Sequence, residues 1–61
     1  MEPSDYLAWK AEGHEVHGIV LAAAGRLEDA RAAYGTAIEL FERKGVVPAI
    51  ARVRERIAAL G

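Results

Sequence analysis

The segment GIVLAAAGRLEDARAAYGTA, residues 18–37, places small residues where the two helices of a hairpin would meet. Gly18 precedes a turn signal at Gly25, and Ala30 and Ala37 follow that turn. Because a missing or short side chain lets two backbones approach closely, these positions predict a tight crossing of two antiparallel helices. The residues predicted at this crossing are Gly18, Leu21, Ala30, Tyr34 and Ala37.

Glycine and proline divide the chain into three predicted helices, at about residues 5–24, 27–44 and 48–60. Gly25 and Gly45 are suited to end the first two helices, because glycine adopts the left-handed conformation of a C-terminal cap at little steric cost. Pro48 suits the first turn of the third helix, where its missing N–H group would have no partner. The 61 residues 1–61 therefore predict a single all-α domain, an antiparallel helical hairpin with a third packing helix.

Residues 11–44 resemble a tetratricopeptide (TPR) helical hairpin, a repeat unit known for binding other proteins. Gly18, Ala30 and Ala37 fall on the close-approach positions of that family, and Tyr34 falls where it keeps a large aromatic residue. Two histidines and a late proline depart from the pattern, so the resemblance implies one degenerate repeat followed by a capping helix. In that family each repeat exposes a hydrophobic face that the next repeat covers.

Composition and charge narrow the class of protein. The chain is 52% hydrophobic and has a net charge of −1, values that differ from those of a disordered tail or of a basic nucleic-acid-binding domain. No run approaches the roughly 18 apolar residues of a membrane span, and residues 1–5 lack the basic start of a secretory signal. We therefore expect a cytoplasmic protein that binds no membrane, no nucleic acid and no cofactor.

The first predicted helix is apolar on more sides than a single neighbour can cover, so we expect its spare face to contact a partner. The residues assigned to this surface are Trp9, Glu12, Val16, Ile19, Val20, Ala22 and Ala23. In the geometry that the TPR resemblance implies, Glu12, Ile19 and Ala22 would line the concave side that receives peptides. The alternative is that Trp9 and Val16 fold beneath the third helix.

Chain length supports association. A domain of this size buries only about 60% of the surface of its unfolded chain and is marginal alone. With no cysteine in the sequence, disulfide bonds are excluded as a further source of stability. We expect a protein or peptide partner, and a homodimer in preference to a monomer.

His14 and His17 are the residues that suggest a metal site, because imidazoles three apart on a helix point the same way. Their spacing is not that of a zinc protease, whose histidines lie four apart. We expect them to be partly buried packing residues, and a metal site remains the alternative.

The charged residues are unevenly distributed, with an acidic excess in residues 1–24 and a basic excess in residues 46–61. This asymmetry favours contact between the first helix of one chain and the third helix of another. Arg52, Arg54 and Arg56 alternate along the third helix, so we expect them to splay around it as a solvated face. With one serine, one threonine and no cysteine, the chain is not expected to be an enzyme.

Three functions follow from these observations. The first is a non-catalytic protein-interaction or oligomerisation module that presents an apolar helical surface. The second is a structural cap or simplified scaffold of a longer repeat protein, with no partner beyond itself. The third is a small nucleic-acid binder in which the second and third helices resemble a helix-turn-helix.

Overall fold

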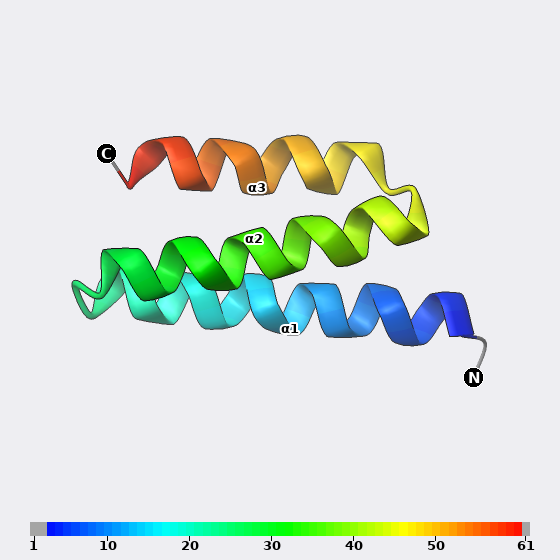
Figure 1. Ribbon diagram of the computed structural model, residues 1–61, viewed down its shortest axis with the longest axis horizontal. Helices are drawn as coiled ribbons and strands as arrows, with labels where there is room; N and C mark the ends of the chain where they lie inside the picture. The colour runs from blue at the N-terminus through cyan, green and yellow to red at the C-terminus, as the bar shows by residue number, and fades with distance from the viewer. Residues whose placement is uncertain (1–2, 61) are drawn as a thin grey trace.

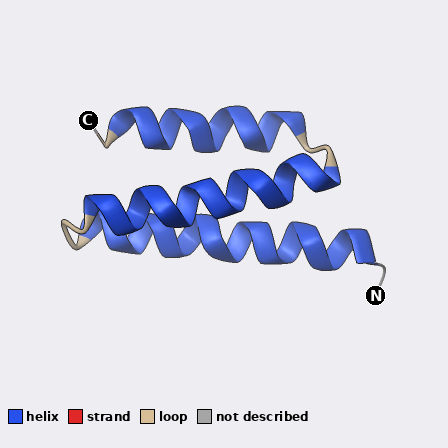
Figure 2. Cartoon of the chain, viewed as in Figure 1, coloured by secondary structure: helices blue, strands red, loops and turns tan. Residues whose placement is uncertain are grey.

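The computed structural model describes residues 3–60, which form three helices joined by short turns (Figure 1). These are α1 (Pro3–Ala23), α2 (Leu27–Lys44) and α3 (Val47–Ala59). Residues 3–60 contain no strand, so the predicted all-α class with three packed helices is confirmed (Figure 2). The predicted bounds of α2 are correct. The helix α1 begins two residues and ends one residue earlier than predicted, and α3 begins and ends one residue earlier.

Both turns use a glycine in the left-handed conformation, with φ of 80° at Gly25 and 81° at Gly45. At the first turn the Arg26 N–H group donates to the Leu21 carbonyl at 2.9 Å, and at the second the Val46 N–H group donates to the Phe41 carbonyl at 3.0 Å. These bonds satisfy carbonyl groups that a helix end leaves without partners. The chain therefore reverses direction within a few residues at each turn.

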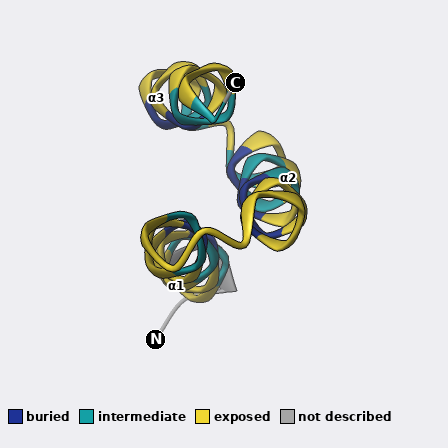
Figure 3. Cartoon of the chain, turned by 90° about the vertical axis from the view of Figure 1, so that its left-hand side faces the viewer, coloured by how far each residue is buried: buried dark blue, intermediate teal, exposed yellow. Residues whose placement is uncertain are grey.

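The helix α2 is the centre of the fold. Both α1 and α3 pack along it, while the backbones of α1 and α3 barely approach each other. An end-on view shows α1 and α3 on the same side of α2 (Figure 3). The buried face of α2 consequently contacts both α1 and α3.

Small side chains dominate the core. Ala11, Ala30 and Ala37 are fully buried, and the largest side chain that is fully enclosed belongs to Val53. Tyr34 and Phe41 supply the aromatic bulk of the cluster. Because hydrophobic stabilisation grows with the apolar area removed from water, a core of alanines gives each helix pair only modest stabilisation.

Gly18 marks the closest approach of α1 to α2. A Cβ atom placed on Gly18 would lie 2.6 Å from both Cδ1 and Cε1 of the Tyr34 ring. Tyr34 is only 3% exposed, so its ring has little freedom to move aside. The glycine is therefore required by packing, because the Tyr34 ring occupies the space that a side chain at Gly18 would need.

We predict opposite effects for two glycine substitutions in α1. Gly18→Ala should destabilise the chain by about 1–3 kcal/mol, because it forces an extra carbon into a filled contact. Gly13→Ala should stabilise it by about 0.5–1 kcal/mol, because alanine is the better helix former and a Cβ at Gly13 meets no atom within 4 Å. Urea unfolding followed by circular dichroism measures both. Equal effects of the two substitutions would contradict the packing role of Gly18.

Candidate interaction surface

One side of α1 carries large apolar side chains that no other helix covers. Trp9 is 66% exposed, Val16 58% and Val20 59%. Their spacing returns them to the same side of the helix, away from Ala11 and Gly18, which face α2. We call Trp9, Val16, Val20 and the exposed Ala23 the outer stripe. The alternative prediction that Trp9 and Val16 fold beneath the third helix is wrong, because α3 packs on α2.

The remaining residues of the predicted surface lie on the flank of α1 that is turned toward α3. Glu12 is exposed, Ile19 is 38% exposed, and Ala22 is half-buried against the core cluster. Ala22 also borders a hollow of about 410 Å³ in which residues of all three helices take part, among them Tyr34 and Arg56. The predicted surface is therefore divided between two sides of α1.

Tyr6 extends the outer stripe toward the N-terminal end of α1, a position that the sequence analysis did not assign. Its ring lies 6.4 Å from the Trp9 ring in a tilted arrangement, and the Lys10 ammonium group stands 5.5 Å from its centre. Its place three residues before Trp9, on a neighbouring side of the same helix, is the signal that would have included it.

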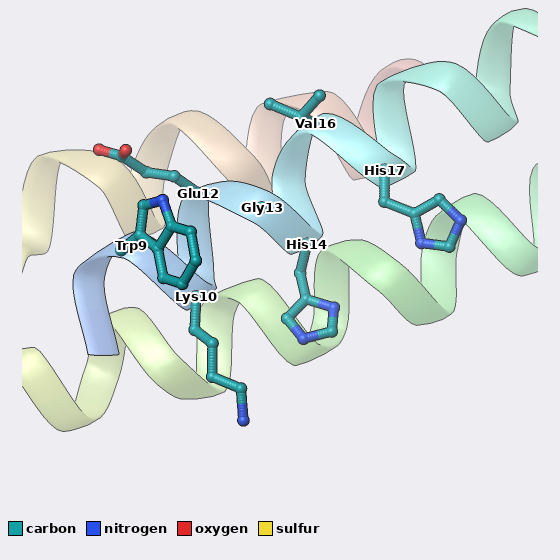
Figure 4. A pocket seen from close by; sticks show the side chains of 7 residues that line it. All are labelled: Trp9, Lys10, Glu12, Gly13, His14, Val16 and His17. Atoms are coloured by element: carbon teal, nitrogen blue, oxygen red, sulfur yellow. The ribbon is translucent and has the colours of Figure 1, made fainter. Parts of the chain in front are cut away.

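A shallow hollow of about 620 Å³ lies beside Trp9 on α1 alone (Figure 4). Gly13 contributes no side chain there, and Trp9 and Val16 stand on either side of it (Figure 4). Because a single helix provides the whole lining, this hollow is a shallow depression in the exposed surface and not an enclosed pocket. It leaves room for a side chain from a molecule that packs against α1.

The two histidines of α1 point away from the outer stripe and border α2 (Figure 4). His14 is half-buried and His17 is exposed, so only His14 has the partial burial expected of a packing residue. Among the described residues, no group of three or more histidine, aspartate and glutamate side chains is placed to hold a metal ion.

The other predicted crossing residues lie at the contact between α1 and α2. Ala30 and Ala37 are fully buried on either side of Tyr34 along one face of α2, and Leu21 is half-buried beside them. This contact fixes the face of α1 that is turned inward. It therefore determines which residues of α1 remain exposed.

An ion cluster joins α1 to α3. Arg52 donates from Nε and Nη2 to the two carboxylate oxygens of Glu15, at 2.9 and 2.8 Å, and Arg56 donates from Nε to Glu15 Oε2 at 2.8 Å. Glu15 is only 5% exposed, whereas both arginine side chains remain partly in solvent. The cluster directly links two helices whose backbones barely approach each other.

The environment of Glu15 favours its charged form. Hydrogen bonds from Arg52 lower the pKa of the Glu15 carboxyl below its ordinary value, burial opposes this shift, and the bond from Arg56 reinforces it. The same contact raises the pKa of Arg52. Glu15 therefore remains ionised in the folded chain despite its burial.

This cluster corrects two expectations. The prediction that the three arginines splay apart is wrong for Arg52 and Arg56, which are four residues apart and share the face turned toward α1. The contact of acidic first helix with basic third helix, expected between chains, forms within one chain.

Comparisons with protein-family models, with curated proteins and with solved structures find no match for this chain. The TPR resemblance therefore stays a prediction. None of the described helices combines the length and the apolar character needed to cross a membrane.

We predict that the stabilisation from Glu15 disappears in acid. Its pKa is lower in the folded chain than the ordinary value of 4.5, so its contribution is complete above that value and declines as the pH falls through the folded pKa. The difference in unfolding free energy between the wild type and Glu15→Gln should therefore shrink between pH 7 and pH 3. Urea unfolding across this range measures it, and a constant difference would contradict the role of the ionised carboxylate.

Proposed function

We propose that this chain is a non-catalytic protein-interaction module that forms a homodimer through the outer stripe of α1. The observation that carries the proposal is the exposure of Trp9, Val16 and Val20 along one side of a single helix. A contiguous apolar surface of this kind is typical of a protein contact. Its burial would remove from water the largest exposed side chain of the described residues.

The small size of the buried side chains supports association. Most of the fully enclosed side chains are alanines, while Trp9 and the valines of α1 lie outside. At about 0.8 kcal/mol for each buried methylene group, covering an indole and two valines adds stabilisation that is substantial for so small a chain.

The spacing of the stripe favours a second copy of the chain as the partner. Trp9 and Ala23 lie seven residues on either side of Val16. In an antiparallel pair with its two-fold axis at Val16, the large indole of each chain meets the small Ala23 of the other. Each surface then fits its own copy, which is the requirement of a two-fold interface.

The proposal assigns no catalytic role to the chain, because the sequence offers few nucleophilic side chains. The sequence contains no cysteine, and its one threonine, Thr36, donates its hydroxyl hydrogen to the Ala32 carbonyl of its own helix at 3.2 Å. A nucleophile requires an adjacent base to activate it. The resemblance to TPR hairpins and the cytoplasmic location expected from the sequence remain parts of this proposal.

We predict that a charge in the stripe dissociates the dimer. Trp9→Asp should weaken self-association by about 2 kcal/mol, or roughly 30-fold, because it replaces the largest aromatic contact of the interface with a carboxylate that must be desolvated. Sedimentation equilibrium at several concentrations measures the change. Ala51→Asp, at an exposed position on α3, is the matched control and should leave the mass unchanged. A monomeric wild type, or an unchanged mass for Trp9→Asp, would contradict the proposal.

We also predict a specific cross-link at the two-fold axis. The chain has no cysteine, so a single introduced thiol reports its own neighbours. Val16→Cys should oxidise to a disulfide-linked dimer at micromolar concentration, because the two positions meet at the axis. Ala51→Cys, treated in the same way, should remain largely monomeric on a non-reducing gel. Equal cross-linking of the two variants would show that the pairing is not centred on Val16.

A further inference from the structure

The helix α3 is attached to the rest of the chain on two sides. Its apolar side places Ala49 and Val53 in the core cluster against α2. Its polar side places Arg52 and Arg56 on Glu15 of α1. The connection to α2 is short and includes the left-handed Gly45.

The hairpin of α1 and α2 has contacts of its own within the core cluster that it shares with α3. The Tyr34 ring rests against Gly18, and Ala30 and Ala37 are buried beside it on the same face of α2. The contact between α1 and α2 is more extensive than the contact between α2 and α3. The larger of these two helix contacts is therefore made without α3.

We propose that α3 is a detachable lid on the α1–α2 hairpin and that the ion cluster of Glu15, Arg52 and Arg56 is its latch. Detachment separates the two arginines from the carboxylate and withdraws Ala49 and Val53 from α2. It uncovers an apolar face of α2 on a different side of the molecule from the outer stripe. The hairpin remains folded while α3 is released.

Two physical arguments support release of α3 as a unit. An isolated helix shorter than about 12–15 residues is only marginally stable in water, so α3, which spans Val47–Ala59, keeps its helical form through docking. Local opening occurs in such contiguous units, and the unit with the fewest buried contacts opens at the lowest free energy. The latch raises that free energy because opening breaks the three hydrogen bonds that Arg52 and Arg56 donate to the Glu15 carboxylate.

Amide hydrogen exchange measured by NMR at neutral pH tests the proposal on the full chain. Glu15→Gln removes the charge that both arginines bind, and Glu42→Gln removes an exposed carboxylate of α2 as a control. In Glu15→Gln the amides of residues 51–59 should exchange about tenfold faster than in the wild type, because charge-assisted hydrogen bonds are lost. Amides of residues 14–22 and 31–40 should change much less, and Glu42→Gln should leave the difference between the regions unchanged.

Two results would overturn the proposal. The first is equal acceleration in all three helices, which means that α3 opens only when the whole chain unfolds. The second is unchanged exchange in α3, which means that the ion cluster does not hold it. If Glu15→Gln does not fold, Arg56→Gln provides the same readout, because it keeps the two hydrogen bonds of Arg52 and removes only one contact. Loss of protection throughout that variant would also overturn the proposal.

Discussion

The contact of the Tyr34 ring with the backbone at Gly18 sets the geometry of this chain. A side chain at Gly18 would overlap the ring, since a Cβ there would come within 2.6 Å of two ring carbons. The two helices can approach this closely only because alanines flank the contact on α2. The close approach determines which face of α1 is buried, and thus which face remains in solvent.

A core built from small residues has consequences for the rest of the molecule. Close packing of alanines brings the backbones together, but it removes little apolar area from water. The third helix contributes Ala49 and Val53 to the core, and its contact with α1 is made by charged groups. Burial of Glu15 would be unfavourable alone, and two arginines that remain partly in solvent offset that penalty at lower desolvation cost.

The two proposals concern different sides of α1. The outer stripe is apolar and lacks a covering helix, and it is available to a second copy without any change in the fold. The ion cluster lies on the flank that faces α3, so opening there alters the surface of α2 and leaves the stripe intact. Association and lid release are therefore independent in structural terms, and their tests use different residues.

The sequence was sufficient to locate the three helices and their joints, because Gly25 and Gly45 permit the left-handed conformation that ends a helix and Pro48 suits the first turn of one. The periodicity of small residues likewise indicated the inward face of α1. The pairing of Glu15 with Arg52 and Arg56 could not be read in the same way, since it joins residues far apart in the chain. Their contact depends on where α3 lies relative to α1. The same placement left Trp9 and Val16 uncovered, because α3 packs along α2 and does not cross the outer side of α1.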